Sequence, residues 1–189
     1  SVGVAATSHK AIHNLLDEVE RVASAEGLTF AGLKKAGRSH ESWYEGRFVR
    51  SSNDNTECER CDAALLAGTS WLFAREGFCD RLDTLFIDEA GQVALADALA
   101  VSRAARNLVL LGDPQQLAHV SQGVHPAGSG QSVLTHLLGG RATVAPTHGI
   151  FLEQTWRMHD EGCGFVARMS YGGRLGSEAG CARQRVGSA

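Results

Sequence analysis

The sequence predicts an α/β fold, in which a parallel sheet is covered by helices on both faces. Short, continuous apolar segments recur along the chain, as expected of strands that are buried on both faces of a sheet. Segments with helical spacing of apolar residues lie between them. The length of 189 residues, with 43% hydrophobic and 21% charged residues, suits an ordinary globular domain, or one domain and part of another.

Charge and composition argue against a protein that grips nucleic acid by bulk charge and against a membrane-spanning protein. Lys and Arg number 18 against 21 Asp and Glu, which gives a net charge of −3, so any nucleic-acid contact is expected to be local rather than made by bulk charge. No apolar run approaches the roughly 20 residues that cross a bilayer, and no secretory signal is visible. We therefore expect a cytoplasmic protein without a membrane partner. The five cysteines, an odd number, are expected to be reduced.

The chain is expected to begin with a strand followed by a helix. Residues 1–6 are apolar and β-branched, and residues 9–25 carry apolar side chains at helical spacing. Thr7 or Ser8 is expected to cap this helix, since a hydroxyl there accepts a free backbone N–H.

The remaining elements follow from the same patterns. The segment 34–62 is polar and has little periodicity, although 47–50 is compatible with a short strand. A Gly/Ser-rich loop is expected at 123–131. Strands are expected at 28–33, 63–67, 82–88, 108–111 and 150–153, and helices at 92–105, 132–138 and 159–169.

Two adjacent carboxylates, Asp88 and Glu89, end the apolar strand in the segment LFIDEA at 85–90. In open α/β sheets this end of a strand is where ligands bind. In a nucleotide-hydrolysing site the first carboxylate can hold Mg²⁺ and the second can orient and deprotonate the attacking water. Alternatively, both carboxylates cap the helix expected from Gln92, where the helix dipole favours anions.

A second strand ends in a polar turn in the segment LVLLGDPQQL at 108–117. Gln116 could bond a phosphate oxygen or a lytic water there, and the alternative is a Gly-Asp-Pro turn that only starts a helix. A third segment, LEQTWRMH at 152–159, carries Arg157. This arginine could supply charge to a transferring phosphoryl group, or it could be a surface residue stacked on Trp156.

Taken in order, these segments resemble superfamily 1 helicases of the Upf-type branch, which have a RecA-like motor core. The matching motifs are AATSHKA at 5–11 (motif Ia), AGT at 67–69, DEAG at 88–91 (motif II, Walker B), GDPQQL at 112–117 (motif III) and QTWRMH at 154–159 (motif IV). The phrases AGTSWLFAR, FIDEAGQV, AARNLVLLGDPQQL and YGGRL are similar to bacterial helicases of this branch, some fused to a RecB-like nuclease.

The resemblance implies ATP hydrolysis with Mg²⁺, coupled to movement along single-stranded DNA or RNA. It assigns Mg²⁺ to Asp88, general-base catalysis to Glu89, sensing of the γ-phosphate to Gln116, and the arginine finger to Arg157. All four residues would contact the bound nucleotide. A fused or associated nuclease is a further partner that the resemblance suggests.

The same resemblance implies the contacts to nucleic acid and the domain organisation. Thr7, Ser8 and Thr69 would contact the phosphate backbone of a single strand, with His9 and Lys10 as weaker candidates. Residues 1–148 would form the first RecA-like domain, with an irregular insertion at about 34–62. Residues 149–189 would begin the second RecA-like domain.

The phosphate-binding loop of this fold, G-x-x-x-x-G-K-S/T, does not occur in the 189 residues. Family motif order places this loop and its strand just upstream of Ser1, so we expect an incomplete P-loop NTPase fold. The first strand is then expected to flank the missing strand and to expose an edge or a core face. Without the loop, the chain alone is expected to hydrolyse ATP poorly or not at all.

Two other functions are compatible with the residues. The first is a RecA-like module that binds nucleic acid or a partner without hydrolysis. The second is a metal-dependent hydrolase in which Asp88 and Glu89 ligate a catalytic ion directly, although further ligands at suitable spacing are not apparent.

Cysteine and aromatic residues give two smaller alternatives. Cys58 and Cys61 have the spacing of half a zinc site, but no second pair is visible, so two incidental thiols are expected. Trp71 and Phe73 are expected to pack beneath the sheet. The alternative for these aromatic residues is base stacking in a single-strand binder.

Overall fold

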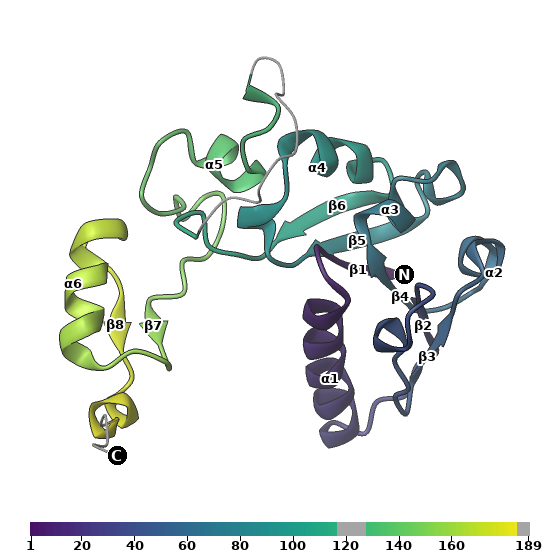
Figure 1. The fold of residues 1–189 in the computed structure, drawn as a ribbon, viewed down its shortest axis with the longest axis horizontal. Helices are drawn as coiled ribbons and strands as arrows, with labels where there is room; N and C mark the ends of the chain where they lie inside the picture. The colour runs from purple at the N-terminus through teal and green to yellow at the C-terminus, as the bar shows by residue number, and fades with distance from the viewer. Residues whose placement is uncertain (117–127, 185–189) are drawn as a thin grey trace. The chain divides into compact units, whose positions relative to one another are not determined.

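A computed structural model describes residues 1–116 and 128–184, which divide into two compact units, 1–136 and 137–189. The first unit holds a six-stranded sheet of order β3-β2-β4-β1-β5-β6, in which every neighbouring pair is parallel (Figure 1). This sheet and its flanking helices confirm the predicted α/β class. The strands are β1 (Val2–Ala6), β2 (Gly32–Lys35), β3 (Val49–Ser52), β4 (Leu65–Thr69), β5 (Leu82–Ile87) and β6 (Ala105–Leu110).

Helices and short 3-10 turns connect these strands. The helices of the first unit are α1 (His9–Ala25), α2 (Asn55–Arg60), α3 (Ser70–Phe73) and α4 (Leu95–Ser102), and α5 (Val133–Leu138) lies at its boundary with the second unit. The 3-10 turns are at His40–Ser42, Glu76–Phe78 and Ala90–Gln92. The second unit holds β7 (Gln154–Thr155), α6 (Asp160–Ser170), β8 (Gly176–Ser177) and a 3-10 turn at Ala179–Arg183, and β7 and β8 pair in parallel.

The helix α1 begins and ends as the sequence predicts. Ser8, rather than Thr7, is its N-cap, because the Ser8 hydroxyl accepts a hydrogen bond from the Ala11 N–H at 3.1 Å. Ile12 and Leu16 lie on the buried side of the helix and are fully buried.

Side chains of the central strands alternate between the two faces of the sheet. On one face Val4, Ala6, Leu65 and Ala67 belong to the core that α1 covers. The residues between them, such as Ala5 and Leu66, belong to the second core, which includes residues of α3 and α4. Figure 1 shows α1 on one side of the sheet and α3 and α4 on the other. The sheet is therefore covered on both faces, as the apolar strands predict.

The stretch 34–62 has more structure than its sequence suggests. It includes the end of β2, all of β3 and all of α2, and β3 forms one edge of the sheet. The Glu20 carboxylate of α1 accepts hydrogen bonds from the backbone N–H groups of Arg47, Phe48 and Val49 at 2.9–3.0 Å. These bonds hold the entry to β3 against α1, a tertiary contact that local periodicity does not reveal.

The expectation that the first strand lies beside an open edge is wrong. The strand β1 is internal and pairs with β4 on one side and β5 on the other. At the end of the sheet opposite β3 lies β6, which pairs only with β5 among the described strands. The side chain of Leu108 in β6 is 39% exposed, although its apolar segment predicts a buried strand.

Several element boundaries also differ from the predictions. The strand expected at 28–33 is β2, which is shifted toward the C-terminus, and the helix expected at 92–105 is confined to α4. No strand is observed at 150–153, where one was expected, and the two-residue strand β7 follows this segment. Most of the Gly/Ser-rich segment at 123–131 lies outside the described residues. The predicted domain boundary after residue 148 stays a prediction, since the division into compact units falls after His136.

The five cysteines are free thiols, as expected. Within the described ranges, no group of three or more His, Cys, Asp or Glu side chains could hold a metal ion. Arg81 instead donates hydrogen bonds to the carbonyl groups of Cys58, Glu59 and Cys61 and so caps the C-terminal end of α2. In the same described part of the chain, no helix is long and apolar enough to span a membrane.

Lys34 is the largest fully buried side chain of the sheet, with an exposed fraction of 0%. Its ammonium group donates to the Ser42 carbonyl and lies 3.3 Å from Nδ1 of His9. Burial, and secondarily the charge of Lys35, lowers the pKa of Lys34 to about 8. The native state therefore holds a buried cation near neutral pH, which costs folding free energy.

This buried lysine predicts a pH dependence of stability. Between about pH 8 and the unfolded-state pKa near 10.5, the unfolded chain binds more protons at Lys34, so the free energy of unfolding rises with pH. We expect urea unfolding to show that the stability difference between Lys34→Met and the wild type falls by about 1 kcal/mol from pH 7 to pH 9.

Comparing Lys34→Met with the wild type separates the pH dependence of stability due to Lys34 from that due to the Cys58 thiol. Burial raises the pKa of Cys58 to about 11, so this thiol contributes stability that is lost as the pH rises past its unfolded-state value near 9. Both proteins retain Cys58, and its effect cancels in the difference. A difference that stays constant from pH 7 to pH 9 would contradict the account of Lys34.

Candidate functional site

The carboxyl ends of the parallel strands bring most of the predicted site residues of the first unit to one edge of the sheet. Thr69 ends β4, Thr7 follows β1, Asp88 follows β5 and Leu111 follows β6. These four strands are neighbours in the order β4-β1-β5-β6. Ligands of open α/β sheets bind beyond this edge.

Asp88 and Glu89 leave the sheet in a constrained turn. The Asp88 N–H donates to the Ala5 carbonyl of β1 at 2.8 Å, which extends the pairing of β5 by one residue. The Asp88 carboxylate accepts the Glu89 N–H at 2.9 Å, and Glu89 has left-handed backbone angles, φ 54° and ψ 36°. Such angles are uncommon outside glycine and occur often at functional sites. Both side chains are half-buried.

The loops after β5 and β6 pack directly against each other. The Ala90 N–H donates to the Leu111 carbonyl at 2.8 Å, and the Leu111 N–H donates to the Ile87 carbonyl at 2.9 Å. A Cβ on Gly91 would lie 2.2 Å from the carbonyl oxygen of Asp113, and a Cβ on Gly112 would lie 2.8 Å from the Ala90 nitrogen. Only glycine permits this approach at either position.

The turn after β6 is held by Asp113. Its carboxylate accepts the Gln115 N–H at 2.9 Å, and its carbonyl accepts the Gln116 N–H at 3.4 Å. Gln116 is exposed. The segment is thus a Gly-Asp-Pro turn that leaves Gln116 exposed to solvent. This turn follows β6, the neighbour of the strand β5 that Asp88 and Glu89 follow.

The capping alternative for Asp88 and Glu89 is wrong. The helix α4 begins at Leu95, and its N-cap residue is Ala94, which makes no side-chain capping bond. Glu89 precedes the 3-10 turn Ala90–Gln92 but makes no capping bond to it through its side chain. Across residues 1–116 and 128–184, no lysine, arginine or histidine forms an ion pair with either carboxylate. Half-buried carboxylates without an internal cation fit a divalent cation.

The predicted nucleic-acid contacts lie on the neighbouring strands. Ala6 of β1 is in register with Thr69 of β4, so Thr7 and Ser8 lie next to the end of β4. Thr7 and Ser8 are exposed and Thr69 is half-buried. The Ser8 hydroxyl oxygen already accepts the bond that caps α1, but its O–H can still donate to a phosphate.

His9 differs from the other candidates. Burial, followed by the charge of Lys34, lowers the pKa of His9 below its ordinary value of 6.5. At neutral pH its imidazole is therefore uncharged and can offer a phosphate only a hydrogen bond. Neither the burial of Lys34 nor this electrostatic effect is apparent from the sequence, because both depend on the pairing of β2 with β4.

Arg157 belongs to the second unit, whereas Asp88, Glu89 and Gln116 belong to the first. It follows β7, its backbone N–H donates to the Thr155 hydroxyl at 3.2 Å, and its side chain is exposed. Within the described residues, no cation–π contact joins Arg157 to Trp156, so the stacked alternative is not observed.

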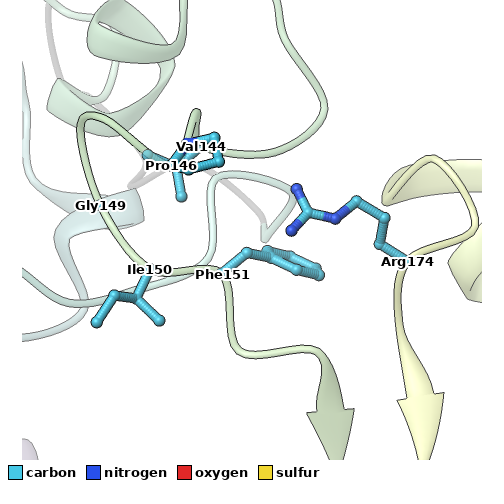
Figure 2. A pocket seen from close by; sticks show the side chains of 6 residues that line it. All are labelled: Val144, Pro146, Gly149, Ile150, Phe151 and Arg174. Atoms are coloured by element: carbon cyan, nitrogen blue, oxygen red, sulfur yellow. The ribbon is translucent and has the colours of Figure 1, made fainter.

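The second unit also contains an open hollow of about 290 Å³, and no predicted site residue lines it (Figure 2). Arg174 lies beside this hollow, with its guanidinium 4.8 Å from the centre of the Phe151 ring. The same guanidinium forms an ion pair with Glu153 at 2.7 Å. Because this charge is already paired, the hollow offers little to a phosphate, and the edge of the first unit's sheet is the better candidate site.

The fold and this edge define an α/β module of the nucleotide-binding type. A family model described as the viral superfamily 1 RNA helicase core domain matches residues 54–162, more than half of the chain. The chain therefore belongs to this helicase family, and its sheet is that of a RecA-like helicase core. The match includes Thr69, Asp88, Glu89, Gln116 and Arg157. No curated protein matches the chain significantly.

The close approach of the loops after β5 and β6 predicts that a methyl group added at Gly91 lowers stability. In Gly91→Ala, the new Cβ must displace the Asp113 carbonyl, so we expect the free energy of unfolding to fall by about 1–3 kcal/mol in urea. Hydrogen exchange of the Ala90 and Leu111 amides should also accelerate, since their bonds join the loops.

Gly162→Ala is the matched control. Gly162 lies in α6, and a Cβ at this position would have no atom within 4 Å, so stability should be unchanged or raised by up to about 1 kcal/mol. The described contact between the loops is contradicted if Gly91→Ala is as stable as the wild type and if its Ala90 and Leu111 amides exchange as slowly as those of the wild type.

Proposed function

We propose that this chain is part of an ATP-driven helicase that couples ATP hydrolysis to movement along single-stranded DNA or RNA. The observation that carries the proposal is the packing of the Asp88–Glu89 turn against the turn that presents Gln116, in a chain of the superfamily 1 helicase core family. A Upf-type motor, and a nuclease fused to it or associated with it, are finer parts of the same proposal and rest on resemblance.

In this proposal the two carboxylates divide the chemistry. Asp88 holds Mg²⁺, which when bound to ATP neutralises charge on the phosphates. The backbone bond from Glu89 N–H fixes one oxygen of the Asp88 carboxylate and leaves the other for the cation or its water. Glu89, whose backbone is left-handed, orients the attacking water and accepts its proton.

Gln116 and Arg157 act on the γ-phosphate from two sides. Gln116 bonds the γ-phosphate or the lytic water and reports its loss through the turn that Asp113 holds. Arg157, on the second unit, is the arginine finger that stabilises the charge of the transferring phosphoryl group. Gln116 belongs to the first compact unit and Arg157 to the second.

The single strand contacts the part of the edge formed by β1 and β4. Hydroxyls of Thr7, Ser8 and Thr69 bond phosphate oxygens, and His9 adds an uncharged contact. Such contacts carry no base preference, so both DNA and RNA are candidate strands.

The second candidate function is a RecA-like module that binds nucleic acid without hydrolysis. The 189 residues contain no G-x-x-x-x-G-K-S/T segment, the loop that holds the phosphates in this fold. For the same reason the chain tested by itself is expected to hydrolyse ATP at background. Both candidates require single-strand binding, and hydrolysis in the native protein separates them.

Single-strand binding by the chain is the first prediction of the proposal. Labelled oligothymidylate and oligouridylate should bind, as measured by fluorescence anisotropy, and added salt should weaken the binding only moderately, because few cations contribute. In Thr7→Val together with Thr69→Val, the loss of two hydroxyl contacts should weaken binding by about 10-fold or more, at roughly 1 kcal/mol per hydrogen bond.

The control is Thr29→Val, which changes an exposed threonine that precedes β2 at the opposite edge of the sheet. This variant should bind as the wild type does. If the wild-type chain binds neither strand, or if the control weakens binding as much as the double variant does, the proposed nucleic-acid contacts are wrong.

A further inference from the structure

Trp71 does not pack beneath the sheet, contrary to the prediction from its sequence context. Its side chain is 85% exposed, whereas its neighbours Leu72 and Phe73 are buried. The three residues occupy α3, a helix of a single turn. Since successive residues of one turn point in different directions, the burial of Leu72 and Phe73 leaves Trp71 facing solvent.

The surroundings of Trp71 are those of the proposed nucleic-acid contacts. Trp71 comes two residues after Thr69, and the backbone of Thr69 is paired with β1 immediately before Thr7 and Ser8. On the other side of β4, Lys35 of β2 lies close to the carboxyl end of β4. A Cβ added to Gly68 would lie 3.3 Å from the Cβ of Lys35. Hydroxyls and a basic side chain thus flank the end of the strand that leads to Trp71.

An exposed indole at this position suits the face of a base. Each base has a flat π-surface that stacks on aromatic rings, and such stacking is tolerant of sequence. Leaving a tryptophan in water is unfavourable, and a base that covers the ring recovers this cost. Proteins that bind single strands combine polar contacts to the backbone with aromatic platforms for the bases.

We propose that Trp71 is a stacking platform for a base of the single strand whose phosphates contact Thr69 and Thr7. This inference rests on the proposed function, since it names a further contact of the same nucleic-acid site. Trp71 then contributes affinity without sequence preference, and the hydroxyls fix the backbone beside it.

The test compares binding of three variants to labelled oligothymidylate by fluorescence anisotropy. Trp71→Ala should weaken binding by about 5- to 150-fold, the range that corresponds to one lost base stack. Trp71→Phe keeps an aromatic face and should restore most of the affinity. Trp156→Ala removes an indole that is 73% exposed on the second unit and should leave binding unchanged.

An abasic oligonucleotide distinguishes stacking from a structural effect. It keeps the phosphates but has no bases, so Trp71→Ala should bind it as well as the wild type does. Thermal unfolding of Trp71→Ala should match the wild type, because the side chain is exposed. Equal weakening toward both oligonucleotides would overturn the proposal.

The outcomes separate this inference from the proposed function. If the wild type binds oligothymidylate and Trp71→Ala binds it equally well, the stacking proposal fails and the proposed function stands. If the wild type binds no single strand, the proposed function fails and the stacking proposal fails with it. If Trp71→Ala changes self-association rather than strand binding, the ring is a protein contact and the proposal is wrong.

Discussion

The candidate site depends on the close approach of the backbone after β5 to the backbone after β6. The bond from the Ala90 N–H to the Leu111 carbonyl forms because Gly91 and Gly112 lack side chains that would separate the two loops. This contact sets the turn of Asp88 and Glu89 beside the turn that presents Gln116. In the proposed motor, this contact is the route by which loss of the γ-phosphate would alter neighbouring strands.

The proposed nucleic-acid contacts lie at the same sheet edge, beyond β1 and β4. Because β1 lies between β5 and β4, the residues that follow it separate the carboxylates from Thr69 and Trp71. The proposed nucleotide and strand contacts thus occupy adjacent parts of one sheet edge and share β1. Buried Lys34 affects this edge indirectly, since its charge helps to keep His9 neutral. The proposed affinity for a strand rests on hydroxyls and stacking rather than on bulk charge, in agreement with the net charge of −3.

Sequence patterns predict the features that depend on local chemistry. The bounds of α1, a cap at Thr7 or Ser8 and the strand that Asp88 follows are predicted by periodicity and capping. The internal position of β1 and the burial of Lys34 depend on strand order, which periodicity does not encode. The role of Gly91 depends on a neighbouring strand that is distant in sequence. The apolar neighbours of Trp71 suggest that it is buried too. In the single turn of α3, however, Leu72 and Phe73 point into the core and Trp71 is exposed.

The most direct test of the central claim is steady-state ATP hydrolysis by the protein expressed from its native reading frame. Wild type and Glu89→Gln would be compared with and without a single strand, and nucleotide binding would be measured in parallel. Hydrolysis stimulated by the strand should fall by at least about 100-fold in Glu89→Gln, the loss expected for a general base, while ATP still binds. Equal hydrolysis by both proteins, or ATP binding without hydrolysis by the wild type, would contradict the assignment of this edge as a hydrolytic site.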